Sequence, residues 1–265
     1  MSIDRVTSAD GTSIAFEKSG HGPPIILVGG AFCDRGARAS GTPLASFLSL
    51  GFTVYSYDRR GRGGSGDTPN WSLEREVEDL AALIQAAGGS ASVYGISSGA
   101  LLALAAAERE LPILELALYE PPVLLDESRV KQLEDLAEQL QELATSGRRS
   151  DAAELFLTRV VMVPAPAVAQ MKQAPMWRGL ESLAHTLSYD ARITALGPTL
   201  RERASSVRAT TLALYGEACP PWMRDAIQAL SHAIPGARSR MLAGQSHDVD
   251  PKVLAGVLSE FFRAS

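Results

Sequence analysis

The stretch Tyr94-Gly95-Ile96-Ser97-Ser98-Gly99-Ala100 constrains the fold more than any other part of this 265-residue chain. A short apolar strand pattern leads into it, and a helical pattern rich in alanine and leucine follows it directly. A serine at such a strand-to-helix turn takes a strained backbone conformation that exposes its hydroxyl, and small residues two positions before and after let helix and strand approach. Gly95 and Gly99 meet that need. We therefore predict that Ser97 is a nucleophile on a sharp turn; a tight structural turn is the alternative.

Continuous apolar runs elsewhere in the chain predict strands that are covered on both faces, as in a parallel sheet flanked by helices. These runs span residues 24–28, 52–57, 114–120 and 211–216. Apolar and polar residues alternate on either side of Asp10-Gly11, which predicts a two-stranded hairpin at a sheet edge. Further patterns predict a helix over 73–87 after an N-cap at Ser72, a strand over 238–242 and a closing helix over 251–263. The fold class is therefore α/β.

Residues 123–206 carry helical periodicity without a convincing strand pattern, and prolines divide them into short segments. Helices inserted at the carboxyl edge of a parallel sheet lie above the place where such sheets bind ligands. We therefore expect a core made of residues 1–122 and 207–265 and a helical lid, or cap, made of residues 123–206. The short helices predict few long-range anchors and a mobile lid. Added core is the alternative interpretation.

The composition predicts a globular protein that acts on a small molecule. Hydrophobic residues make up 46% of the chain and charged residues 21%, and a net charge of -5 gives no reason to expect nucleic acid or acidic lipid as a partner. Neither a signal-peptide pattern nor an apolar stretch of membrane-spanning length is present in the sequence, so a cytoplasmic location and no membrane partner are expected. Cys33 and Cys219 lack the spacing of a zinc site and predict two reduced thiols. No metal and no cofactor are expected.

Four motifs, taken together, resemble the α/β-hydrolase family over essentially the whole chain. They are Gly95-Ile96-Ser97-Ser98-Gly99, Val28-Gly29-Gly30-Ala31, the stretch from Tyr57 to Ser65 with Asp58-Arg59-Arg60-Gly61-Arg62-Gly63, and Gly244-Gln245-Ser246-His247. The resemblance implies the serine-hydrolase branch of the fold, with a lid inserted after the sixth strand. It also implies Ser97 as nucleophile and His247 as the base that takes its proton. We interpret the charges of the motif from Tyr57 to Ser65 as ion pairs that build the fold.

The resemblance also implies where an oxyanion hole and a substrate pocket would lie. The backbone N–H groups of Ser98 and Ala31 are the expected oxyanion donors, with Phe32 as the alternative to Ala31. The expected lining of the pocket is apolar and comes mainly from the lid. Its candidate residues are Phe32, Met162, Met171, Met176, Trp177 and Tyr189, and the lid residues among them are equally suited to the lid's own core.

The chain departs from the family at the third catalytic position. Cys219 stands where an aspartate is usual, and a thiol of ordinary pKa cannot stabilise an imidazolium as a carboxylate does. We predict that Glu120, at the end of the preceding strand, takes this role, because neighbouring strands are only about 4.8 Å apart. Glu217 is the alternative acid and Asp248 a weaker one, and a Ser-His dyad without an acid stays open.

The leading functional hypothesis is a serine hydrolase that cleaves an ester, thioester or lactone of a small, largely apolar substrate through an acyl-enzyme. Ser97, rather than an aspartate, argues against the haloalkane dehalogenases and epoxide hydrolases of this fold. A ligand-binding or accessory protein with little catalysis is the first alternative, because the usual acid is missing. A carbon-carbon bond hydrolase or lyase is the second.

Overall fold

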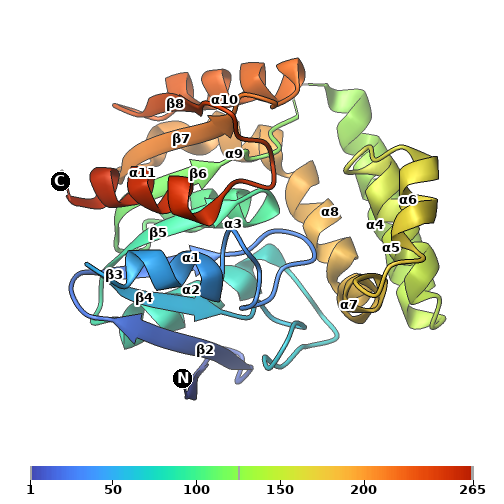
Figure 1. The fold of residues 1–265 in the computed structure, drawn as a ribbon, viewed down its shortest axis with the longest axis horizontal. Helices are drawn as coiled ribbons and strands as arrows, with labels where there is room; N and C mark the ends of the chain where they lie inside the picture. Colours follow the sequence, from blue (N-terminus) through green and yellow to red (C-terminus); the bar gives the residue numbers. More distant parts are fainter. Residues whose placement is uncertain (1, 125, 264–265) are drawn as a thin grey trace.

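The predicted strands form one eight-stranded sheet in the order β1-β2-β4-β3-β5-β6-β7-β8, as seen in the computed structural model, which describes residues 2–124 and 126–263 (Figure 1). The first strand pairs, β1 with β2 and β2 with β4, are antiparallel, and the others are parallel. The strands are β1 (Ile3–Thr7), β2 (Ser13–Gly20), β3 (Pro24–Val28), β4 (Thr53–Tyr57), β5 (Ala91–Ile96), β6 (Ile113–Tyr119), β7 (Thr210–Gly216) and β8 (Arg238–Leu242). The predicted α/β class and the edge hairpin are confirmed.

Helices cover both faces of the sheet, as continuous apolar strands require. Side chains of successive strand residues point to opposite faces, so Val93 of β5 lies in one buried cluster and Tyr94 in another. The first cluster includes residues of α2 (Leu73–Ala86), α3 (Ser98–Glu108) and α10 (Pro221–Ala233), and the second includes residues of α1 (Thr42–Leu48) and α11 (Pro251–Arg263). Ser72 caps α2 by accepting a hydrogen bond from the backbone N–H of Arg75, as expected.

The described residues of the segment between β6 and β7 form helices joined by short loops, with no strand among them. It contains α4 (Glu127–Thr145), α5 (Arg149–Arg159), α6 (Ala165–Met171), α7 (Trp177–Leu183), α8 (Leu187–Ala195), α9 (Gly197–Arg203) and two short 3₁₀ turns, Ala184–Thr186 and Ala204–Ser206. Helices α4 to α7 lie beyond the ends of the strands, and α8 lies between these helices and α3 (Figure 1). Buried residues of α4 to α8 form a separate apolar cluster. Ile193 on the other side of α8, Leu200 of α9 and Ala204 belong instead to the first of the two clusters described above. The division into core and lid stays a prediction.

The arginines that follow β4 form buried ion pairs, as the sequence predicted. Arg59 contacts Glu76 and Asp190, Arg60 contacts Asp79 and Asp10, and Arg62 contacts Asp190. Burial lowers the pKa of a guanidinium, but the carboxylates of Glu76 and Asp190 outweigh it and raise the pKa of Arg59. These pairs tie the loop after β4 to α2, to the β1–β2 turn and to α8.

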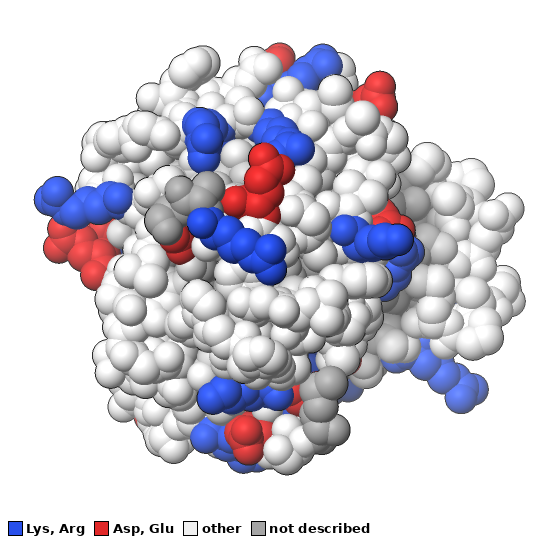
Figure 2. Space-filling model, turned by 60° about the vertical axis from the view of Figure 1, so that its left-hand side comes forward, with Lys and Arg blue, Asp and Glu red and all other residues white. Residues whose placement is uncertain are grey.

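On the face drawn in Figure 2, positive and negative side chains alternate and do not gather by sign. Among the described residues, no helix is both long and apolar enough to cross a membrane.

Candidate active site

Ser97 lies on the sharp turn between β5 and α3, and its backbone is strained. Its φ of 56° and ψ of −129° lie outside the regions that residues other than glycine usually occupy. A Cβ atom on Gly95 would lie 2.5 Å from the carbonyl oxygen of Gly99, and one on Gly99 would lie 2.5 Å from those of Gly29 and Val28. The turn therefore closes only because both flanking residues are glycines.

The loop after β3 lies directly against Ser97. A Cβ on Gly30 would be 2.9 Å from the Cβ of Ser97, so only glycine allows this approach. The N–H of Cys33 donates to the carbonyl oxygen of Gly30 at 3.3 Å, and Phe32 has a φ of 57°. Residues 30–33 thus form a β-turn with Ala31 and Phe32 at its centre. Ala31, the expected oxyanion donor, and its alternative Phe32 therefore follow directly after the residue that lies against Ser97.

Ser98 begins helix α3, where backbone N–H groups have no partner within the helix. Its hydroxyl donates to Oδ1 of Asp190 on α8 at 2.7 Å. This bond turns the Ser98 side chain toward α8 and leaves its backbone N–H at the helix end that follows Ser97. Ser98 and Ala31 therefore belong to two separate elements: Ser98 follows Ser97 at the start of α3, and Ala31 follows Gly30, which lies against Ser97.

His247 follows β8 and contacts Glu120, which follows β6. Nδ1 of His247 lies 2.6 Å from Oε2 of Glu120, and Oε1 of Glu120 accepts the N–H of Gly216 at 3.0 Å. The carboxylate is 1% exposed, whereas the imidazole side chain is 51% exposed. Glu120 has a φ of 44°, a left-handed conformation that a residue such as this adopts only under tertiary constraint.

The loop that carries His247 is fastened across the end of β7. The hydroxyl of Tyr119 donates to the carbonyl oxygen of Ser246 at 2.6 Å, and the N–H of Ala218 donates to that of Gln245 at 3.0 Å. A Cβ on Gly216 would lie 2.5 Å from the same Gln245 oxygen. The loop therefore passes close over the end of β7, which brings His247 to the end of β6.

The other candidate acids have different partners. Oε2 of Glu217 accepts the backbone N–H of Gly244 at 2.8 Å, and Asp248 pairs with Arg38 at 3.4 Å on the surface. Cys219 is buried, and burial, followed by the nearby charge of Glu120, raises the pKa of its thiol to about 12. Among the described residues, Glu120 is the carboxylate hydrogen-bonded to His247.

Comparison with known proteins identifies the family of this chain. The model of the Alpha/beta hydrolase family matches residues 25–257. The chain belongs to the α/β-hydrolase family. It is similar to an α/β-hydrolase from Sphaerobacter thermophilus DSM 20745 of known crystal structure, with 48% identity over 98% of this chain and 100% of that one and a TM-score of 0.88.

Two more distant likenesses bear on the fold and on part of the sequence. A thermophilic esterase from Thermogutta terrifontis has 21% identity over 100% of this hydrolase and 99% of its own chain, with a TM-score of 0.77. A curated protein of Mycobacterium tuberculosis, "Putative non-heme bromoperoxidase BpoC", is 30% identical over 94 residues, which are 34% of this chain and 35% of that protein. This hydrolase thus aligns with about a third of the length of its curated relative.

The apolar residues expected to line a pocket have different surroundings in the structure. Met162 and Met176 are 62% and 56% exposed. Trp177 is buried within the helical segment and donates its indole N–H to Ser150. Tyr189 stacks on Trp71, with ring centroids 5.0 Å apart, and donates to Asp67.

Phe32 and Met171 are the two of this set that pack, partly buried, against the apolar cluster of the helical segment. Phe32 makes an edge-to-face contact with Phe156 of α5, and it lies in the turn beside Ser97. Met162 lies between α5 and α6, and Met176 directly precedes α7, so helical periodicity places neither of them. The shared pocket stays a prediction.

Asp190 of α8 was missed in the sequence, and it anchors this helix to the core. Its carboxylate is fully buried and contacts Arg59, Arg62 and Ser98. Burial raises its pKa, but the guanidinium groups of Arg62 and Arg59 outweigh burial and hold the pKa below its ordinary value. The expectation of few long-range anchors is therefore wrong for α8. The local sequence contains no clear signal for it, because Ser188, Arg192 and Thr194 stand close to Asp190.

Proposed function

We propose that this α/β-hydrolase is a serine hydrolase that cleaves an ester, thioester or lactone of a small, largely apolar molecule. The observation that carries the proposal is the Glu120–His247 contact, together with the strained turn at Ser97, whose backbone N–H donates to the carbonyl oxygen of Tyr119, the residue before Glu120. Family membership supports hydrolysis in general. The bond type and the apolar character of the substrate belong to the proposal.

In the proposed reaction, Glu120 accepts Nδ1–H of His247 and leaves Nε2 as the ring nitrogen that can take a proton. His247 removes the hydroxyl proton of Ser97 as Oγ attacks the substrate carbonyl, and Glu120 stabilises the imidazolium that forms. The negative oxygen of the tetrahedral intermediate is bound by the N–H groups of Ser98 and Ala31. His247 then protonates the leaving group, and the same groups activate water to release the acyl group from Ser97.

The alternative of a binding protein rested on the absence of the usual acid at Cys219. A buried carboxylate at 2.6 Å from His247 supplies what a thiol with a pKa of about 12 cannot. It therefore favours the enzyme over the binder. No comparable observation favours a carbon-carbon bond hydrolase or lyase.

The test is to react the protein with a fluorophosphonate, to map the adduct by mass spectrometry, and to assay aryl esters of increasing acyl length. We expect the adduct on Ser97 and a loss of turnover in Ser97→Ala of roughly 10⁴-fold or more. Ser239→Ala, an exposed serine of β8, is the control and should behave as wild type. An adduct on another serine contradicts the nucleophile, and the lack of both adduct and hydrolysis supports the binding alternative.

A further inference from the structure

We propose that Asp190 of helix α8 is a positioning residue that, through Arg59 and Arg62, sets the geometry of both oxyanion donors. The inference rests on the proposed function, because it concerns the same site. The side chain of Asp190 is fully buried. It is linked to the loop after β3 through Arg59 and Arg62.

The Asp190 carboxylate accepts three hydrogen bonds from the groups around the nucleophile. Oδ1 accepts from Nη1 of Arg59 at 2.9 Å and from the hydroxyl of Ser98 at 2.7 Å. Oδ2 accepts from Nη2 of Arg62 at 2.7 Å. One side chain of α8 therefore holds the first residue of α3 and two arginines of the loop after β4.

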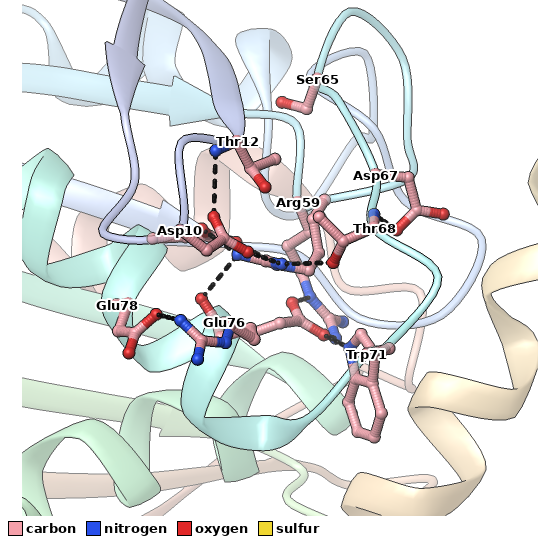
Figure 3. A network of polar contacts seen from close by, with 12 residues as sticks. Asp10, Thr12, Arg59, Ser65, Asp67, Thr68, Trp71, Glu76 and Glu78 are labelled. Carbon is pink, nitrogen blue, oxygen red and sulfur yellow. Dashed lines mark hydrogen bonds and ion pairs between the residues drawn. The ribbon is translucent and has the colours of Figure 1, made fainter.

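The same arginines hold the loop that contains the other oxyanion donor. Nη1 of Arg59 donates to the carbonyl oxygen of Gly29 at 3.1 Å, and Nη1 of Arg62 donates to that of Gly30 at 2.5 Å. Arg59 is in turn fixed by a two-bond contact with Glu76, which also accepts the indole N–H of Trp71 (Figure 3). The guanidinium groups thus form a rigid link between Asp190 and the loop after β3.

Peptide geometry converts this link into a direction for an N–H group. The described chain has no cis peptide bond, and in a planar trans peptide the C=O and the following N–H point in opposite directions. The bond from Arg62 to the Gly30 oxygen therefore fixes where the N–H of Ala31 points. Because Gly30 lies against Ser97, that N–H is held beside the nucleophile.

Stability alone is a weak reason for this cluster. Replacing a buried ion-pair network by apolar side chains is often neutral or stabilising, because desolvation of the charges offsets their attraction. A planar guanidinium, however, can bind a carboxylate and a carbonyl with separate nitrogens at fixed angles. Arg62 uses Nη2 for Asp190 and Nη1 for Gly30, which a lysine cannot do with one ammonium group.

The experiment compares Arg62→Lys and Asp190→Asn with Arg60→Lys. Arg60 is equally buried and makes a matching two-bond contact with Asp79, but its contacts are with Asp79, Asp10, Thr68 and the carbonyl of Arg75, away from the loop after β3. The measurements are kcat and KM per active site, with sites counted by complete fluorophosphonate labelling, and inhibition by an alkylboronic acid. A boronate bound to Ser97 places one of its oxygens in the oxyanion hole.

We expect Arg62→Lys and Asp190→Asn to lower kcat per site about 10- to 100-fold with KM little changed, since removing an oxyanion donor costs more than displacing it. Boronate affinity should fall in parallel with kcat/KM, as for an analogue of the transition state. Arg60→Lys should lower stability and leave both quantities per site near wild type.

An effect on Arg60→Lys equal to that on the other two variants overturns the proposal, and so do unchanged values of kcat and boronate affinity in Arg62→Lys and Asp190→Asn. If both variants fail to fold, Ser98→Ala tests the proposal instead, because it removes only the Ser98 hydroxyl that donates to Asp190. It should lower kcat and boronate affinity together, and unchanged values overturn the proposal. A wild-type protein that is neither labelled at Ser97 nor active on esters contradicts the proposed function instead.

Discussion

Oε2 of Glu120 lies 2.6 Å from Nδ1 of His247, although the two residues are 127 positions apart and follow strands β6 and β8, which are separated by β7. The contact crosses a strand because the loop after β8 folds back over the end of β7 and is held there by Tyr119 and Ala218. The Gly216 N–H, at the end of β7, binds the second oxygen of the same carboxylate. The carboxylate that contacts His247 thus follows β6, whereas Cys219 follows β7.

Glu120→Gln should lower kcat by about 10² to 10⁴-fold on the best ester found, because the amide can neither hold the required tautomer nor stabilise the imidazolium. Glu217→Gln is the matched control, since its carboxylate binds Gly244 and should leave kcat near wild type. Steady-state kinetics on both variants make the comparison. A loss of kcat confined to Glu217→Gln would show that Glu217, not Glu120, is the acid. No loss of kcat in either variant would indicate a Ser-His dyad.

The Cys219 thiol should resist alkylation in the native protein. Its pKa is raised to about 12 by burial and by Glu120, so at about pH 8 it is far less ionised than an ordinary thiol with a pKa near 8.5. Cys33→Ser leaves Cys219 as the remaining thiol, and iodoacetamide labelling followed by mass spectrometry gives its rate in the native and urea-unfolded states. Adding Glu120→Gln should lower the pKa and speed labelling. Equal rates in the folded and unfolded protein would contradict the pKa.

Asp10→Asn should destabilise the protein near pH 7 by about 1 to 2 kcal/mol, because Asp10 accepts one charge-assisted bond from buried Arg60 and one from the N–H of Thr12. Burial raises the Asp10 pKa, but these bonds outweigh it and hold the pKa well below its ordinary value. A lowered folded-state pKa contributes stability above the unfolded pKa of about 4, which is lost as the pH falls through the folded value.

The difference between wild type and Asp10→Asn should therefore shrink below about pH 4. Urea unfolding at several pH values measures it, with Asp4→Asn on the exposed edge strand as the control. A difference that stays constant down to the acid transition would show that the carboxylate charge has no part in it.

Hydrogen exchange should divide the helical segment into an anchored and a looser part. The amides of α8 should be protected nearly as well as those of β5, because Asp190 binds Arg59, Arg62 and Ser98 in the core. The short helix α6, whose buried side chain is Val168, should exchange much sooner. Mass spectrometry of peptides from both helices tests this. Exchange in α8 as fast as in α6 would mean that the buried ion pairs do not hold it.

Local pattern was sufficient for the elements and for the sharp turn at Ser97. The elbow at Ser97 could be predicted because its glycines are required by contacts within the strand and helix that adjoin them and with the next strand. The closing helix was predicted over residues 251–263 and is Pro251–Arg263, since its apolar residues recur with helical period. The ion pairs of the arginines after β4 were predicted because the motif resembles a structural signature of the family, and in the structure these arginines are buried and paired with carboxylates.

Tertiary structure decided which carboxylate meets which partner. The sequence left Glu120, Glu217 and a dyad open, because the choice depends on how the loop after β8 crosses β7, and no local pattern encodes that path. Asp190 lies 131 positions from Arg59 and 92 from Ser98, so its contacts follow from the packing of α8 on α3. Sequence periodicity reports which face of an element is apolar, whereas pairing of buried polar groups depends on the relative positions of elements far apart in the chain.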